Sequence, residues 1–442
     1  MKRLLILLGT ILVLFFVSGW MELHFFIQSD LFRDWLSRKI GRSIHAEGRL
    51  EPLTWEGSNF QSAGFTATGT GKAKLRSVKA AKISAHVDWH QLLKGQFVID
   101  YLNIEKFDAT FGKGTSPVSP APPSPKPASQ ASSWTFSNLF RPEIRINHVY
   151  VADANLHWTT NRGESGQFTG SKISATQIQP DQWNVDALGG TVQHAAYPPI
   201  GLTRASGTIS HDSIVVHQAN ATLAGGAAIE LTGDIAIAKH LNANLTARFT
   251  DIDANTASPQ AWRFGGRISG QLTYKGDLNH FEHGEVAGSI KISQAAINLA
   301  NVFATLHQLA KFGGLNEVQL DSVATDIRYQ DGDTQFLNFH ASYQDQVRIE
   351  GSGSLGPTHI DADLRLGLSP KILGWIPGAE EHVFAEQKDG LRWTAVRISG
   401  TPEQPREDLT KRLVGAFRDK MTKEFKGQAK DAIKSLLDMF HN

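Results

Sequence analysis

Apolar and polar side chains alternate with a period of two over long stretches of this chain. Residues 228–238 read AIELTGDIAIA, and residues 241–249 read LNANLTARF. Similar alternation returns at residues 268–274 and 360–368. Successive side chains of a β-strand point to opposite faces, so each segment predicts a strand with one apolar face. This predicted apolar face includes Ile229, Leu231, Ile235, Ile237, Leu241, Leu245, Phe249, Leu272, Leu364 and Leu366.

The composition favours strands over helices. The 442 residues include 40 glycines and only 4 methionines, and short runs rich in Ile, Val, Thr, Phe and Trp recur between turn signals. A unit of glycine, polar residue and aliphatic residue recurs, and we interpret its glycines as marking the starts of strands. These glycines are Gly207, Gly233, Gly270, Gly288 and Gly353. We expect a mainly β fold.

The N-terminus carries an apolar run behind two cations. Lys2 and Arg3 precede an unbroken apolar stretch, and apolar residues continue to Ile27. About 20 such residues at ~1.5 Å each are enough to cross a bilayer, so residues 1–28 are predicted to be a membrane anchor. The anchor side chains include Leu4, Leu8, Leu12, Phe16 and Trp20.

A cleaved secretory signal peptide is the alternative interpretation of this run. The segment Val17-Ser18-Gly19 is a poor cleavage site, and the apolar character continues through Trp20, which favours an anchor. The two N-terminal cations predict that the N-terminus stays in the cytoplasm and that the body is exported.

Composition divides the remaining chain into four segments. Residues 29–112 are predicted to form an N-terminal β module, and residues 113–133 a Pro/Ser-rich disordered loop. Residues 134–404 are predicted to form a second β body that contains a short helix at 299–312. Residues 405–442 have apolar side chains at helical spacing beside many lysines and arginines. This amphipathic helix either caps the sheet or contacts a membrane or a protein partner.

The sequence offers little for catalysis or for nucleic-acid binding. The net charge is +1 and there is no cysteine. His86 and His90 would lie about 13 Å apart on a strand, too far to share one metal ion. The G-x-G-x-x-G match at 351–356 is followed by Pro357 and a β pattern instead of the helix that a nucleotide site needs. We therefore predict no catalytic, cofactor-binding or metal-binding residue, no cofactor and no enzyme activity.

Four segments together resemble the AsmA-like family of Gram-negative envelope proteins. They are the N-terminal anchor, GRSIHAEGRL at 41–50, DWHQLLKGQFVIDYL at 88–102 and ISGTPEQP at 398–405. The segment from 366 to 402 is also similar to the end of that family's C-terminal domain. The resemblance implies a single-pass protein of the bacterial inner membrane, with a periplasmic body of the bridge-like lipid-transfer type, linked to outer-membrane biogenesis. The fold expected with it is an N-terminal transmembrane helix followed by an elongated, curled antiparallel β-sheet groove, with a few short helices and a C-terminal amphipathic helix. The chain is shorter than the largest members of the family and carries the Pro-rich insert.

A groove with an apolar face would suit a lipid. Exposing an acyl chain to water costs about 0.8 kcal/mol per CH₂, or roughly 13 kcal/mol for ~16 carbons. The expected partners are therefore the inner membrane and a phospholipid or other envelope lipid, which the groove shelters or conducts. One alternative is that the apolar face is the closed core of a sandwich or barrel.

Two other functions remain open at this point. The first is a non-transporting scaffold or regulator of outer-membrane protein assembly, with an envelope protein bound through the C-terminal helix. The second is an envelope hydrolase, which would need a convergent polar cluster that the sequence does not display.

Overall fold

The computed structural model is mainly β. It describes residues 29–70, 75–92, 96–112, 143–160, 163–195, 197–223, 225–238, 240–254, 264–297, 319–374, 377–402 and 404–424. Strands make up 71% of the structure, and 22 strands in the described ranges form one large mixed sheet. The predicted mainly β class is confirmed. By contacts the chain divides into two compact units, residues 1–211 with 217–221 and residues 212–216 with 222–442.

Several predicted segments lie outside the described residues. They are the anchor at 1–28, the Pro/Ser-rich loop at 113–133, the short helix at 299–312 and the end of the C-terminal helix from 425 onwards. In the part of the chain that is described, no helix has the length and apolar character needed to cross a membrane.

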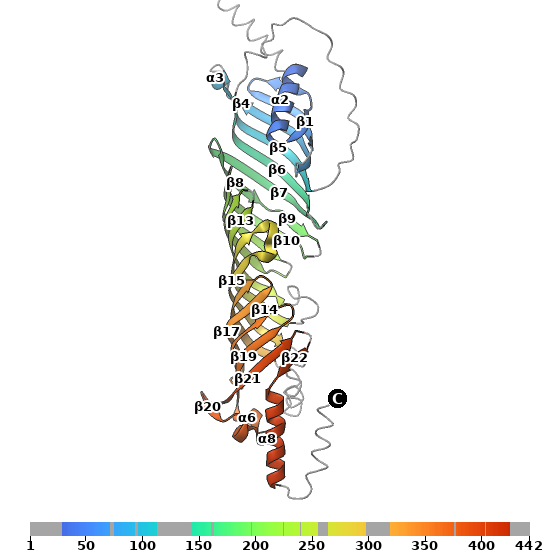
Figure 1. The fold of residues 1–442 in the computed structure, drawn as a ribbon. Helices are drawn as coiled ribbons and strands as arrows, with labels where there is room; N and C mark the ends of the chain where they lie inside the picture. Colours follow the sequence, from blue (N-terminus) through green and yellow to red (C-terminus); the bar gives the residue numbers. More distant parts are fainter. Residues whose placement is uncertain are drawn as a thin grey trace, which may run out of the picture. The chain divides into compact units, whose positions relative to one another are not determined.

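The described part of unit 1 consists of a helix followed by a sheet (Figure 1). Its elements are α2 (Asp30–Ser43), β1 (Ala46–Leu50), β2 (Leu53–Glu56), β3 (Asn59–Gly69), β4 (Leu75–Val87), α3 (Trp89–Leu92), β5 (Gln96–Gly112), β6 (Glu143–Thr159), β7 (Ser165–Gln179), β8 (Gln182–Leu188), β9 (Thr191–His194) and β10 (Ile200–Ser210). Strands β1 and β2 both pair with β3, and pairing continues through β4, β5, β6 and β7. Strands β8 and β9 each pair with both β7 and β10.

Strands β5 and β6 run parallel, whereas β4–β5 and β6–β7 are antiparallel. The expectation of a wholly antiparallel sheet is therefore wrong. A parallel pair needs a connection of about a dozen residues or more to return the chain to the same end, and the segment 113–142 is long enough. Two amide–carboxylate bonds join the pair: Asn147 donates to Asp100 at 3.0 Å and Asn155 donates to Asp108 at 3.1 Å. A shift of one residue would separate both pairs, so they help to fix the register.

Helix α2 lies against the sheet of unit 1. Its N-terminus is capped by the Ser29 hydroxyl, which accepts a hydrogen bond from the Phe32 N–H at 3.3 Å. The Leu50 N–H of β1 donates to the Ser37 hydroxyl at 3.0 Å, which ties the helix to the sheet edge. At Gly41 a Cβ atom would lie 2.5 Å from the Ala46 carbonyl oxygen, so this close approach requires glycine.

Along β4 the side chains that face the interior of unit 1 switch from even-numbered to odd-numbered positions. Val78 and Ala80 face inward before Lys82, and Ile83 and Ala85 face inward after it, since all four line the same cavity. Lys82 has a φ of 51° and its ammonium pairs with Glu105 on β5 at 2.7 Å. One extra residue in a strand re-aims the side chains that follow, so this bulge keeps apolar side chains on the inner face while the strand bends.

Unit 2 is an antiparallel sheet with helices at its last strands. Its elements, apart from β11 (Ser213–Leu223), which contributes to both units, are β12 (Ala228–Ile237), β13 (Leu241–Asp253), β14 (Phe264–Asp277), η2 (Leu278–His283), β15 (Glu285–Ile297), β16 (Gln319–Gln330), β17 (Asp333–Tyr343), β18 (Val347–Leu355), β19 (Ile360–Leu368), α6 (Pro370–Leu373), α7 (Ala379–His382), β20 (Glu386–Lys388), β21 (Leu391–Thr401), β22 (Gln404–Glu407) and α8 (Leu409–Glu424). Each strand from β12 to β19 pairs with the next, and β19 pairs with β21. Strands β20 and β22 both pair with β21.

The recurring glycines lie within strands, so our interpretation of them as strand starts is wrong. Gly233, for example, is in the middle of β12 with a φ of 135°. A Cβ atom there would lie 2.1 Å from the Asn244 carbonyl oxygen on β13. Glycines at such positions allow a strand to kink and so to curve the sheet.

The helices of unit 2 close one part of its apolar face. Leu366 of β19 belongs to a buried cluster with Leu373, Phe384, Leu409 and Leu413 from the segments of α6, α7 and α8. Figure 1 shows α6 and α8 beside β20 and β21. The described half of the predicted C-terminal helix therefore packs its apolar stripe into the core of unit 2.

Polar side chains also join α8 to the sheet. The Arg397 N–H of β21 donates to the Asp408 carboxylate at 2.9 Å, and Arg412 donates to the Thr394 hydroxyl at 3.0 Å. Strand β20 pairs with the start of β21 and β22 pairs with its end, so neither strand pairs with the middle of β21. The two bonds to Asp408 and Arg412 cover this unpaired stretch of the sheet edge.

Candidate functional site

The strand register of unit 2 places the predicted lining residues of β12 to β14 on one face. Side chains directly opposite each other in a ladder point to the same side of the sheet. Ile229 lies opposite Phe249, and Ile237 lies opposite Leu241. Across the next ladder Ala247 lies opposite Leu272. The alternation along each strand brings Leu231, Ile235 and Leu245 to this face as well.

The same face continues to the last strands of the unit. From Leu272 it runs across the ladders through Gly288, Ile327, Phe336 and Gly353 to Ala362. Leu364 and Leu366 follow Ala362 at alternate positions of β19. The register therefore brings together every lining residue that the sequence analysis named.

Burial divides this face into two parts. Leu366 is only 4% exposed and belongs to the closed cluster beneath α6 to α8. The other predicted lining residues are partly exposed, and those on β12, β13 and β14 belong to none of the buried clusters. The part of the face on β12 to β14 could therefore accept further apolar contacts from a ligand.

A cluster of polar side chains lies where β13 begins and β14 ends, around Asp277. The Asp277 carboxylate accepts hydrogen bonds from the Leu241 N–H at 3.1 Å and the Asn279 N–H at 2.9 Å, and it contacts the His240 ring at 2.9 Å. The Asn279 N–H, with smaller contributions from His240 and Leu241, lowers the pKa of Asp277 to about 2. The Tyr274 ring stacks on Phe281 at 4.4 Å between ring centres, and burial raises the pKa of its phenol. The polar groups of this cluster are thus bonded to one another or to the main chain, as in the bond from the Tyr274 hydroxyl to the Asp277 carbonyl at 3.1 Å.

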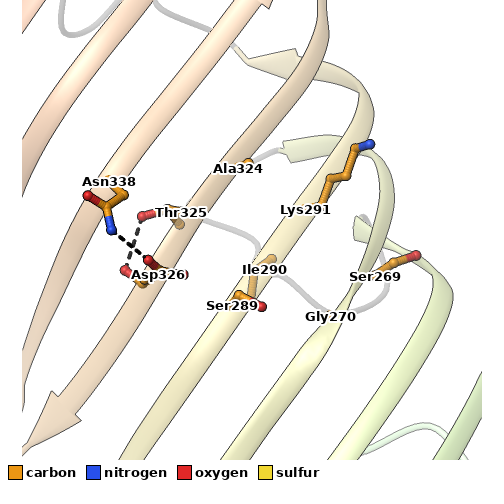
Figure 2. Close-up of a pocket in the computed structure, with 9 residues that line it drawn as sticks. All are labelled: Ser269, Gly270, Ser289, Ile290, Lys291, Ala324, Thr325, Asp326 and Asn338. Atoms are coloured by element: carbon orange, nitrogen blue, oxygen red, sulfur yellow. Dashed lines mark hydrogen bonds between the residues drawn. The ribbon is translucent and has the colours of Figure 1, made fainter.

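A pocket of about 270 Å³ lies on strands β14 to β17 and is partly polar (Figure 2). Asn338 donates to the Asp326 carboxylate at 2.8 Å, and the Thr325 hydroxyl donates to the Leu337 carbonyl at 3.0 Å. Asn338 has a φ of 51° where the β16–β17 and β17–β18 registers shift. Figure 2 shows Lys291 directed away from the Asp326–Asn338 pair. The polar groups therefore stabilise a bulge and do not converge on one point, as a catalytic site would require.

The histidines do not assemble with other ligands into a metal site in the described ranges. No group of three or more His, Asp or Glu side chains there could hold a metal ion. His86 is on β4 and contacts Asn59 at 3.0 Å, whereas His90 lies in α3 and not on a strand as expected.

Unit 1 contains an apolar cavity that the sequence analysis did not identify. The cavity has a volume of about 290 Å³ and lies between α2 and the sheet. Helix α2 contributes Phe32, Leu36 and Ile40 to its wall, and the C-cap residue Ile44 follows at the same spacing of four residues. That helical spacing was the available signal for one wall. The opposite wall depends on the strand bulges, which alternation alone does not predict.

The chain as a whole matches no family model, no curated protein and no solved structure. The described residues thus offer two apolar features that a ligand could contact, the partly exposed face of unit 2 and the cavity of unit 1.

Proposed function

We propose that this protein shelters or conducts the hydrocarbon chains of envelope lipid along the apolar face of unit 2. The observation that carries the proposal is the continuous row of aliphatic side chains across β12 to β14, which remains partly exposed. In this proposal the face is the floor of a curled groove, and Leu245, Phe249 and Leu272 contact the lipid.

The energetics favour a hydrocarbon over a polar ligand on this face. Each CH₂ removed from water contributes about 0.8 kcal/mol, and the lining side chains gain as well, since their own exposed area is covered. The face offers few hydrogen-bond partners to a polar ligand, because polar residues of β12 and β13 such as Asp234 and Asn244 alternate onto the other face.

The membrane setting of the proposal comes from the sequence. Residues 1–28 are proposed to anchor the chain in the bacterial inner membrane with its body in the periplasm. The resemblance to the AsmA-like family supports that location and a role in outer-membrane biogenesis. A scaffold for outer-membrane protein assembly is the alternative if the body carries no lipid.

Lipid carried through purification tests the proposal. Leu245→Glu and Leu272→Glu each place a carboxylate on the face, and a charge among apolar groups should displace a lipid chain. Asn244→Glu is the matched control, because its neighbouring position on β13 faces the opposite side. Leu366 is unsuited to this test because a carboxylate in its closed cluster would unfold the unit.

The measurement is mass spectrometry of lipid extracted from gently purified full-length protein. We expect bound lipid in the unsubstituted protein and in Asn244→Glu, and a loss of most of it in the two leucine variants. Unchanged lipid in Leu245→Glu and Leu272→Glu, with circular dichroism showing an intact fold, would count against the proposal. Lipid-free unsubstituted protein would favour the scaffold.

A further inference from the structure

The cavity of unit 1 is a second apolar site, separate from the lining residues of unit 2. We propose that it binds a single hydrocarbon chain of about 12 carbons and selects its ligand by chain length and not by headgroup. This inference rests on the proposed function, because it assumes that the protein meets lipid. Beyond the proposed function, it names a second binding site, its size and the property of the ligand, chain length, by which that site selects.

The cavity wall is hydrocarbon. Apart from Gln61 and Ser62, its lining residues have apolar side chains. Gln61 is exposed, and its neighbour Ser62 donates to the Glu51 carbonyl at 3.0 Å. The Ser62 oxygen also accepts from the Gly64 N–H at 3.3 Å. The one buried hydroxyl at the wall is thus already bonded within the protein.

Because the Ser62 hydroxyl is already hydrogen-bonded, the wall favours an apolar occupant. A buried water needs two to four polar partners, and a polar headgroup loses its hydration without compensation when it enters an apolar cavity. A hydrocarbon chain loses nothing of that kind and removes its own surface from water. The wall therefore offers no means of distinguishing one headgroup from another.

The volume sets the length of the chain. A cavity of about 150 Å³ lined by aliphatic and aromatic side chains binds benzene, a molecule of six carbons. The cavity of unit 1 is about 290 Å³. At roughly the same volume per carbon it holds about 12 carbons, so a longer chain would leave its end outside.

The position of the cavity along the chain also suits such a ligand. Helix α2, which forms one wall, begins at Asp30. The predicted membrane anchor ends at residue 28, so the cavity would lie next to the bilayer, where acyl chains are concentrated. The outer side of α2 carries the exposed cations Arg38, Lys39 and Arg42, which suit a surface of anionic headgroups.

Neighbouring alanines on β4 provide a matched pair of variants. Ala80 lines the cavity and is 8% exposed, whereas Ala81 is exposed. Ala80→Phe fills the cavity, and Ala81→Phe adds the same ring outside it. Ala85, which also lines the cavity, gives a second filling variant, Ala85→Leu.

The probe is a dodecanoic acid with a diazirine at its terminal carbon, added to the full-length protein and activated by light. Peptide mapping then locates the label. We expect label on α2, β3, β4 or β5, reduced about tenfold by Ala80→Phe and Ala85→Leu and changed less than about twofold by Ala81→Phe. Equal labelling of unit 1 in folded filling variants and the unsubstituted protein would overturn the proposal.

Competition by unlabelled ligands tests the selection rule without any variant. Affinity should rise about fourfold per CH₂ for fatty acids up to about 12 carbons and then level off. Dodecanoate and dodecylphosphocholine should compete equally, within about threefold. A continued rise to 18 carbons, or a strong preference for one headgroup, would contradict the rule even if the filling variants do not fold.

The same maps separate this inference from the proposed function. Label on β12 to β14 alone would reject the cavity site and leave the proposed function standing. Label in unit 1 alone would support the cavity and count against the face of unit 2. The absence of label from both would reject both.

Discussion

Asp277 joins three segments of unit 2 through one carboxylate. It accepts hydrogen bonds from the main chain of Leu241 and Asn279, and it contacts His240. These partners favour the charged form, so its pKa falls from 3.8 to about 2 on folding. The charged Asp277 carboxylate therefore stabilises the folded state fully above about pH 4. This stabilisation is lost as the pH falls through about 2, because protonation of Asp277 weakens it as a hydrogen-bond acceptor.

We expect Asp277→Asn to flatten the acid dependence of stability. The free energy of unfolding, measured with urea at several pH values between about 2 and 5, should fall less steeply in the variant than in the unsubstituted protein. Identical slopes in Asp277→Asn and the unsubstituted protein would refute this explanation.

Gly233 carries a backbone conformation that other residues rarely adopt. Its φ is 135°, and a Cβ atom would meet the Asn244 carbonyl oxygen at 2.1 Å. We expect Gly233→Ala to lower the free energy of unfolding by about 1–3 kcal/mol. Gly415→Ala is the contrast, since α8 leaves open space at that position and alanine favours a helix by about 1 kcal/mol. Chemical denaturation of both variants checks the signs, and a neutral Gly233→Ala would contradict them.

At the scale of the element, one sheet face has two kinds of lining. Leu366 lies in a cluster closed by α6, α7 and α8, whereas Leu245 remains partly exposed. Truncation of a buried leucine leaves a cavity, so Leu366→Ala should cost about 2–5 kcal/mol. Leu245→Ala should cost about 1 kcal/mol or less in lipid-free protein, because less area is lost from burial.

Bound lipid should alter that difference. If Leu245 contacts a chain, truncation should lower the thermal midpoint of the lipid-loaded protein more than that of the lipid-free protein, since binding stabilises the folded state. Leu366→Ala should lower both by similar amounts. Equal losses for Leu245→Ala in the two forms would show that Leu245 makes no contact with lipid.

Alternation predicted the elements that depend on short-range pattern. Residues 228–238 became β12, and the aliphatic residues of β12 and β13 share a face as expected. The glycine at 233 was misinterpreted, because a glycine at a strand start and a glycine at a kink look the same in sequence. The conformation of Gly233 depends on the neighbouring strand, which one sequence does not reveal.

The missed features depend on contacts between distant residues. The parallel pairing of β5 with β6 brings Asp100 beside Asn147 and Asp108 beside Asn155, residues 47 apart in the sequence. The unit 1 cavity depends on the bulge at Lys82, which moves the inward-facing positions of β4 by one residue. The apolar and polar pattern of the sequence around Lys82 does not predict this bulge. Only the wall from α2 carried a local signal, the spacing from Phe32 to Ile44.

At the scale of the whole molecule, the chain has an apolar cavity in unit 1 and, in unit 2, an apolar face that is partly open and partly closed by helices. In the proposed function, hydrocarbon on β12 to β14 would meet partly exposed side chains, and further along the face of unit 2 it would meet the buried cluster around Leu366. A chain moving in that direction must leave the face or displace α8. The bonds from Asp408 and Arg412 to β21 oppose that displacement.

The most direct test of the central claim is a photoreactive amino acid at position 245 of the full-length protein in intact cells, with position 244 as the control. The two neighbours on β13 face opposite sides of the sheet. The account predicts lipid adducts at position 245 and almost none at position 244, detected by mass spectrometry of the purified protein. Equal adducts at both positions, or none at position 245 in a folded protein, would contradict the claim that this face holds lipid.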